Sequence, residues 1–295
     1  MRLVRRLASL PVLTASLLLS GCSYFLPTKR HLPVPITPPN VQALSPDDLV
    51  KQINTRWETL NNLTATVEIS ATQTKSSEGT ATDFPSCRGY ILMQKPNSLR
   101  VFGTYFGVRI FDMASDGNNF TLFVPHNETE YKGTSTVSEK SPNPLLNLRP
   151  GFFLDSIVVR GLDPDEEYMV SSDTETVPDA ANKHLYLEPE YILSVMRHKK
   201  GQENVPVRTV TFHRDDMLPY DQYIYNQDGV PETQIFYSNY QIYTAGKYPS
   251  KIVIKRPQEG IQLVLSVIRV EENVKMGPDQ FELNIPEGTK IQILK

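Results

Sequence analysis

The strongest constraint on the fold of this chain is a strict alternation of apolar and polar residues that begins at Leu63. Up to Thr72, every second residue is apolar, and the residues between are threonine, serine or glutamate. Because successive side chains of a β-strand point to opposite faces, this pattern predicts an antiparallel strand with one buried face.

Shorter segments with strand character follow in two series. The first lies at about 86–95, 98–105, 108–114, 119–125 and 128–133, and the second at about 157–161, 184–195, 206–214, 220–227, 232–243, 249–257 and 261–271. The connections carry the turn pairs Pro96-Asn97, Phe106-Gly107, Asp116-Gly117, Asp228-Gly229 and Glu259-Gly260. Many short strands joined by tight turns predict a mainly β chain with one large antiparallel sheet or barrel.

One amphipathic helix precedes the strands. Ser45 has the character of an N-cap, Pro46 suits the first helical position, and two aspartates follow in the first turn. Apolar residues then recur every three or four positions, at Leu49, Ile53, Trp57 and Leu60. The pair Asn61-Asn62 ends the predicted helix.

A second break in the strand pattern lies between the two series, at residues 141–154. This segment is apolar but contains prolines and a glycine, so we expect a short helix–loop–helix. It is a candidate plug of the barrel or a candidate insertion loop, through Leu145, Leu146, Leu148, Phe152 and Phe153.

The N-terminus has the organisation of a targeting signal. Three arginines at positions 2, 5 and 6 precede an apolar run from Leu7 to Leu19, which is shorter than the roughly 20 residues of a spanning helix. The run ends in Leu-Ser-Gly-Cys, which resembles the lipobox of bacterial lipoproteins; the alternative is an ordinary secretory signal. The resemblance implies that residues 1–21 are removed, that Cys22 is acylated, and that Ser23 directs the protein to the outer membrane.

The predicted domain organisation follows from these segments. After the signal, residues 22–44 are rich in proline, which predicts an extended membrane tether. Residues 45–295 form a single β domain. The alternative to an extended tether is that part of this segment lies along the surface of the domain.

Composition excludes several classes of protein. Without residues 1–21, the chain has 27 lysines and arginines against 33 acids, a net charge of −6, which argues against nucleic acid as a partner. Cys87 is then the only other cysteine and is expected to be a small buried hydrophobe. A structural zinc site of four cysteines, or of two cysteines and two histidines, is excluded by this count. The histidines lack metal-binding spacing, and no hydrolase or phosphate-loop motif occurs, so we expect no enzyme, metal or cofactor. We interpret the acids at 163–167 as a solvated loop rather than a calcium site.

Five features in a fixed order resemble the LolA/LolB-like superfamily of lipoprotein carriers and receptors. They are the helix end at 57–63, the G-x-hydrophobic…K-P-x-x-L-R hairpin at 89–100, the S-D-G hairpin at 115–125, Pro-Leu-Leu at 144–146, and the closing segments at 248–252 and 281–288. The resemblance implies an open, strongly curved antiparallel β-barrel of about 11 strands with short plug helices.

In that family, acyl chains bind on the concave side of the barrel. Candidate lining residues are Trp57, Val67, Ile69, Leu92, Val101, Phe120, Leu122, Ile252, Ile254, Leu263 and Leu265. An ordinary packed core is the alternative for these positions. Arg100 and Arg109 are both candidates for a cavity-facing arginine, and the stretch at 162–182 is an addition to the family pattern.

The sequence therefore predicts a membrane-anchored lipid- or lipoprotein-binding protein on the periplasmic face of the outer membrane. Its expected partners are the membrane, through Cys22, lipid or lipoprotein acyl chains, and a periplasmic lipoprotein carrier. The alternative function is that of a non-transporting structural or sensory lipoprotein that binds protein partners.

Overall fold

A computed structural model describes residues 34–75, 78–135, 141, 143–178, 181, 184–198 and 204–294. The predicted signal, Cys22 and the first part of the tether lie outside these residues. The described residues divide into two units: one holds residues 34–37 with the described part of 176–186, and the other holds the described parts of 38–175 and 187–294. In the first unit, Ile36 forms a parallel bridge to Tyr186, and its N–H donates to the Leu185 carbonyl over 2.7 Å.

Fourteen strands are present in the described residues, and they form one sheet in the order β14-β6-β5-β4-β3-β2-β1-β13-β12-β11-β10-β9-β8-β7. Their bounds are β1 Asn62–Lys75, β2 Thr80–Gln94, β3 Ser98–Tyr105, β4 Val108–Ser115, β5 Asn119–Val124, β6 Thr129–Thr134, β7 Glu166–Pro178, β8 Leu185–Arg197, β9 Val205–His213, β10 Pro219–Tyr225, β11 Pro231–Tyr243, β12 Gly246–Arg256, β13 Ile261–Glu272 and β14 Lys290–Leu294. The end strands β14 and β7 have one neighbour each in this order, so the barrel is not closed.

The mainly β, open architecture is confirmed, but three details of the prediction were wrong. The sheet has 14 strands rather than about 11, and β14 runs parallel to β6. Residues 157–161 are not a strand, because helix α3, Pro150–Ile157, continues to Ile157 and an irregular connection follows. The sequence pattern missed β7 and β14 since nearly all their side chains are exposed or half-buried, and such strands lack an apolar repeat.

Strand β1 lies inside the sheet, between β2 on one side and β13 on the other. It pairs with β2, where Ala65 faces Ile91, and with β13, where Ala65 faces Val270. Every second residue from Leu63 to Ile69 is buried, as the alternation predicted. The alternating pattern therefore places one face of the central strand in the core.

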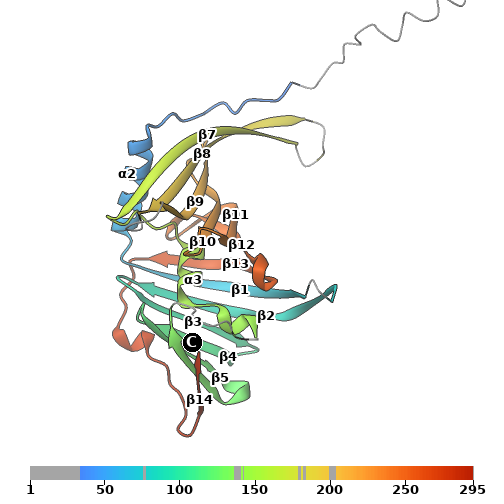
Figure 1. Ribbon diagram of the computed structural model, residues 1–295, viewed down its shortest axis with the longest axis vertical. Coiled ribbons are helices and arrows are strands. Elements are labelled where there is room, and N and C mark those ends of the chain that lie inside the picture. Colours follow the sequence, from blue (N-terminus) through green and yellow to red (C-terminus); the bar gives the residue numbers. More distant parts are fainter. Residues whose placement is uncertain are drawn as a thin grey trace, which may run out of the picture. The chain divides into compact units, whose positions relative to one another are not determined.

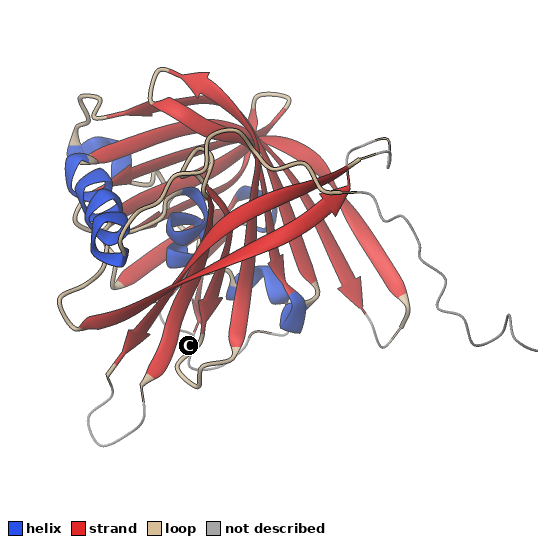
Figure 2. Cartoon of the chain, turned by 90° about the horizontal axis from the view of Figure 1, so that it is seen from above, coloured by secondary structure: helices blue, strands red, loops and turns tan. Residues whose placement is uncertain are grey.

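Helix α3, Pro150–Ile157, lies on the concave side of the sheet. It contacts both β4 and β12, which are separated by four strands in the sheet order, so the strands of the second unit curve around it (Figure 1, Figure 2). The short helix η3, Pro144–Asn147, precedes it. The predicted helix–loop–helix at 141–154 is confirmed.

Helix α2, Pro46–Thr59, is the predicted amphipathic helix, and its capping is confirmed. The Ser45 hydroxyl accepts a hydrogen bond from the Asp48 N–H over 3.2 Å. Its apolar face forms a second core with β8 and β9, made by Leu49, Val50, Ile53, Tyr191, Leu193, Val195, Val210 and Phe212. Before the helix, the Leu44 N–H donates to the Tyr191 hydroxyl over 2.9 Å, so the last residues before α2 lie on the sheet.

Candidate functional site

Most of the predicted lining residues belong to one apolar core on the concave face. Eight are buried there, namely Val67, Ile69, Val101, Phe120, Ile252, Ile254, Leu263 and Leu265, while Trp57 and Leu122 pack against it half-buried. Leu92 lies elsewhere. It alternates with the buried Ile91 and Met93, and it faces a shallow hollow on the opposite side of the sheet.

The segment predicted as a plug or insertion loop packs against the same core. Phe152 and Phe153 are buried and meet edge to face, with their ring centroids 5.2 Å apart. Leu145, Leu146 and Leu148 are half-buried against the core. The segment thus fills much of the concave side of the curved sheet.

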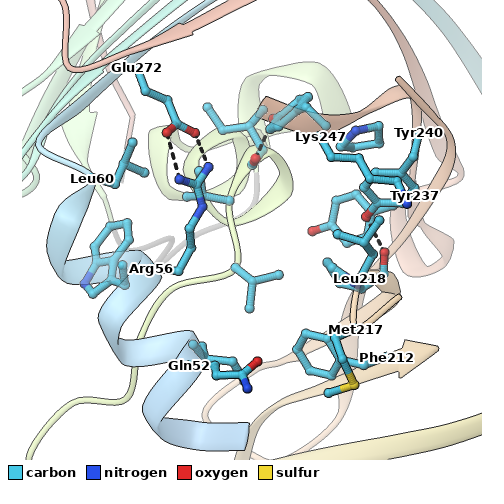
Figure 3. A pocket seen from close by; sticks show the side chains of 18 of the residues that line it. Gln52, Arg56, Leu60, Phe212, Met217, Leu218, Tyr237, Tyr240, Lys247 and Glu272 are labelled. Carbon is cyan, nitrogen blue, oxygen red and sulfur yellow. Dashed lines mark hydrogen bonds and ion pairs between the residues drawn. The ribbon is translucent and has the colours of Figure 1, made fainter. Parts of the chain in front are cut away.

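An apolar pocket remains open between α2 and the strands β9 to β12 (Figure 3). Its volume is about 280 Å³. Its walls are made by Leu49, Ile53, Trp57, Leu60, Ile157, Val158, Val159, Phe212, Met217, Leu218, Pro219, Tyr237, Tyr240, Tyr248 and Pro249. Of the residues that the sequence singled out as a lining, Trp57 alone is in this wall, because the others belong to the core beneath, except Leu92 on the opposite side of the sheet.

Polar side chains also line the pocket, and two of the charged ones are joined in an ion pair. The Arg56 guanidinium makes a two-pronged contact with the Glu272 carboxylate, with Nη1 2.9 Å from Oε2. Opposite, the Lys247 ammonium lies 2.8 Å from the Asp216 carboxylate. Gln52 completes the polar part of the lining. The charges of Arg56 and Lys247 are therefore already balanced within the protein.

Three tyrosines, Tyr237, Tyr240 and Tyr248, line the pocket. The Tyr240 hydroxyl donates to the Pro219 carbonyl, and the Tyr248 hydroxyl donates to the Ile157 carbonyl over 2.5 Å. The Tyr237 hydroxyl has no hydrogen-bond partner among the described residues. Burial raises the pKa of all three hydroxyls, so they are protonated at neutral pH.

Neither Arg100 nor Arg109 lies on the concave face, and both line the shallow hollow on the opposite side of the sheet that Leu92 also faces. Arg100 and Arg109 both bind the buried Asp112 carboxylate on the other face of β3 and β4, and Arg100 Nη2 lies 2.7 Å from it. The Arg100 guanidinium also donates to the Gln280 carbonyl over 2.9 Å, which ties down the C-terminal segment. The alternation of β3, with Val101 buried on the concave side, could have placed Arg100 on the opposite face.

Arg256 is an arginine on the concave face that sequence reasoning missed. It continues the alternation of Ile252 and Ile254 at the end of β12, and its guanidinium lies 5.7 Å from the Phe152 ring centroid. Its Nε is 2.8 Å from the Glu259 carboxylate. The position could have been found from the parity of β12, since Ile252 and Ile254 were both predicted to face inward.

The acidic stretch at 163–167 is only partly the solvated loop that we expected. Asp163 and Asp165 are exposed, but the Glu166 side chain is 1% exposed and lies 2.9 Å from Arg197 and 3.3 Å from Arg208. Within the described ranges, no three acidic, histidine or cysteine side chains are placed to hold a metal ion. No helix in the described part of the chain is long and apolar enough to cross a membrane.

Exposed apolar residues gather at the turn between β3 and β4. Phe106 is 91% exposed and Val108 is 67% exposed, and the ring of Tyr105 lies 4.6 Å from that of Phe106. Phe106 has a φ of 47°, a left-handed conformation that a bulky residue rarely adopts. We define residues 105–108 as the β3–β4 tip.

Comparison with known proteins identifies the fold. No family model and no curated protein sequence matches the chain. Among solved structures, a LolA superfamily protein from Nitrosomonas europaea superposes with a TM-score of 0.52 at 13% identity, over 82% of this chain and 99% of that one. A DUF1329 family protein from Desulfovibrio piger has a TM-score of 0.52 at 15% identity, over 80% and 95%.

An outer membrane lipoprotein-sorting protein domain from Vibrio parahaemolyticus has a TM-score of 0.51 at 11% identity, over 79% of this chain and 94% of that one. The structural resemblance to LolA superfamily proteins that the sequence motifs predicted is thus confirmed. At these identities the comparison establishes a common fold, and function has to be argued from the site.

Proposed function

We propose that this protein binds the acyl chain of a lipid or lipoprotein in the pocket beside α2 and assists lipoprotein sorting or insertion at the outer membrane. The observation that carries the proposal is an apolar pocket on a curved sheet whose fold is shared with LolA superfamily and lipoprotein-sorting proteins. Burying an acyl chain needs apolar surface and no catalytic group, which agrees with the expectation that the protein is not an enzyme.

The size of the pocket supports the binding of one acyl chain. A volume of about 280 Å³ holds about nine methylene groups at ~30 Å³ each, if a methylene occupies as much space as a water molecule in the liquid. Burying them contributes about 7 kcal/mol before the loss of translational freedom, at ~0.8 kcal/mol per methylene. Binding is therefore reversible, as handing a lipid onward requires.

The proposed anchor is the acylated Cys22, which the sequence motif at residues 19–22 supports. An acylated protein is held at the membrane surface, whereas the pocket lies in the folded domain beyond the tether. We assign the protein to the periplasmic face of the outer membrane on the basis of Ser23 and of the sorting-related structural neighbour.

Binding is tested with the mature chain carrying Cys22→Ser, titrated with a ten-carbon lysophospholipid, 1-decanoyl-glycero-3-phosphocholine. Trp57 is the single tryptophan of the chain and lines the pocket, so its fluorescence reports occupancy directly. We expect saturable binding that Val159→Phe weakens at least tenfold by filling the pocket. Ile268→Phe, an exposed apolar site outside the pocket lining, is the control. Absence of saturable binding to the wild-type domain would refute the proposal.

The β3–β4 tip supports a contact with the membrane surface in the same proposal. Burying the Phe106 ring and its apolar neighbours in the lipid interface removes them from water. Next to them, Arg109 and Arg100 share the single Asp112 carboxylate, and the net positive charge suits anionic headgroups. Phe106→Asn is expected to reduce binding of the Cys22→Ser chain to anionic vesicles about tenfold or more. Ile242→Asn, which replaces an 89% exposed residue away from the tip, is the matched control, and equal losses in both variants would argue against this contact.

Depletion of the protein in cells distinguishes the proposed function from the alternative, that of a structural or sensory lipoprotein. Mislocalised outer-membrane lipoproteins after depletion support the sorting function. Unchanged lipoprotein sorting, together with altered envelope integrity or signalling, favours the alternative.

A further inference from the structure

The Tyr237 hydroxyl is a polar group that the protein itself leaves without a partner at an apolar binding site. Tyr237 is 6% exposed and lies on β11, in the wall of the pocket that faces α2 (Figure 3). No described residue forms a hydrogen bond with its hydroxyl. Buried tyrosine hydroxyls usually have a partner, since losing hydrogen bonds to water without replacement is unfavourable.

The neighbouring tyrosines show that the wall otherwise follows this rule. Tyr240 and Tyr248 line the same pocket, and each donates its hydroxyl hydrogen to a main-chain carbonyl. The charged side chains Arg56 and Lys247 are held by Glu272 and Asp216. Tyr237 differs from these four residues because its buried hydroxyl has no hydrogen-bond partner among the described residues.

Because the Tyr237 hydroxyl is a hydrogen-bond donor, the ligand group next to it has to be an acceptor. Burial raises the pKa of Tyr237 well above its usual value, so the hydroxyl keeps its proton and acts as a donor. A hydrocarbon chain has no acceptor for it. An acyl chain has one, the carbonyl oxygen at the point where the chain is esterified, and that oxygen carries no hydrogen of its own.

We propose that the Tyr237 hydroxyl donates a hydrogen bond to the acyl carbonyl of the bound lipid, so that the pocket prefers ester-linked acyl chains to alkyl chains of equal length. This inference rests on the proposed function, which requires apolar binding alone. It adds a residue that recognises the linkage between the chain and the rest of the lipid. One neutral hydrogen bond in such a site corresponds to a preference of about tenfold.

The test compares two lipids that differ only in the carbonyl group, 1-decanoyl- and 1-decyl-glycero-3-phosphocholine. Both are titrated against the mature chain carrying Cys22→Ser, with Trp57 fluorescence as the readout. The wild-type pocket is expected to bind the ester more tightly than the ether, by about tenfold. Tyr237→Phe is expected to bring the two affinities together by weakening ester binding, with ether binding unchanged.

Tyr243→Phe is the matched control. The Tyr243 hydroxyl donates to the Val267 carbonyl over 3.0 Å and its side chain is not among those that line the pocket, so its loss leaves the ester-to-ether ratio unchanged. An equal ratio in wild type and Tyr237→Phe overturns the inference while leaving the proposed function intact. Failure of both lipids to bind the wild-type chain refutes the proposed function instead.

A measurement on the wild-type protein keeps the inference testable if Tyr237→Phe does not fold. The carbonyl stretching frequency of a ¹³C-labelled decanoyl ester is recorded in the bound state. A hydrogen-bonded carbonyl absorbs at lower frequency than the same ester in dry hydrocarbon, and we expect this lowering. A bound carbonyl with the frequency found in hydrocarbon overturns the inference.

Discussion

The Tyr248 hydroxyl donates a hydrogen bond to the main-chain carbonyl of Ile157 over 2.5 Å. This contact joins β12 to the last residue of α3, and both residues line the pocket. The side chains of Phe152 and Phe153 attach the same helix to the core, and Gln222 Nε2 donates to the Asp155 carbonyl over 2.7 Å. Tyr248 therefore sets the position of the end of α3, and with it one wall of the site.

We expect Tyr248→Phe to lower the free energy of unfolding by about 1–3 kcal/mol, because the Ile157 carbonyl loses its donor in a buried environment. Urea denaturation followed by circular dichroism measures the change. Tyr105→Phe, at an exposed tyrosine of the β3–β4 tip, serves as the control and should be nearly neutral. Equal stability of Tyr248→Phe and wild type would show that the contact contributes nothing to stability.

The buried ion pair of Arg208 and Glu166 supports a second prediction. Their side chains are 3% and 1% exposed, and the same guanidinium group donates to the Gly161 carbonyl over 2.8 Å. Arg208→Met should destabilise the fold by about 3 kcal/mol or more, since a carboxylate is left buried with one partner fewer.

A double variant separates the cost of the buried charge from the worth of the pair. Arg208→Met combined with Glu166→Gln should recover part of the stability lost in the single variant. Arg269→Met, which breaks an exposed pair with Glu271, is the surface comparison and should change stability by less than about 1 kcal/mol. A double variant less stable than Arg208→Met would contradict this account.

Glu190 predicts a pH dependence of stability. Burial raises the pKa of this carboxyl above its ordinary value of 4.5, the charges of Glu175 and Asp221 raise it further, and the Tyr220 hydroxyl and His213 oppose the shift. A folded-state pKa above the unfolded value means that the folded protein binds the proton more tightly. The contribution to stability is full below about pH 4.5 and is lost as the pH rises through the raised pKa.

Glu190→Gln removes this loss because a neutral amide replaces the buried carboxylate. We expect the variant to be more stable than wild type at pH 7, by about 1 kcal/mol, with the difference disappearing towards pH 4. Urea midpoints between pH 4 and pH 8 provide the measurement. Exposed Glu287→Gln is the control, and a Glu190→Gln curve parallel to wild type would show that Glu190 does not titrate as described.

Gly260 supports a prediction that separates the cost of a positive φ from the cost of a collision between an added Cβ and the main chain. Its φ is +65°, and a Cβ there would collide with the main-chain oxygen of Thr74, whose N–H donates to the Gly260 carbonyl over 2.7 Å. Gly260→Ala should therefore lower stability by about 3 kcal/mol. Gly246 also has a positive φ, +98°, but no other atom lies within 4 Å of the position that a Cβ would take, so Gly246→Ala should cost only about 1 kcal/mol. Equal costs would show that the collision at Gly260 is relieved by relaxation.

The local parts of the fold could be predicted from short-range patterns. The cap at Ser45, the helix after it and the buried parity of β1 follow from residue types at fixed spacings, and each is confirmed. The exposed strands β7 and β14 could not be predicted in this way, because they are held by hydrogen bonds to neighbouring strands and bury few apolar side chains.

The site could be predicted only in part. Trp57 was among the expected lining residues, but the wall also comes from the chain at 157–159, 212–219 and 237–249, which no sequence pattern connects. The sequence predicted apolar strand faces, and most of these became packed core. Space is left where α2 and the β9–β10 turn fail to close over the sheet, and this depends on how the elements pack.

The sequence was enough to predict the elements with a strong local pattern, the mainly β class, and the likeness to LolA superfamily proteins. Alternation and capping are properties of neighbouring residues, so they can be seen without the fold. Two features could be seen only in the folded chain: the sheet stays open, and Tyr237 lies at the pocket with no partner among the described residues. These features depend on contacts between residues far apart in the chain, whose distances are set by the packing of the whole sheet.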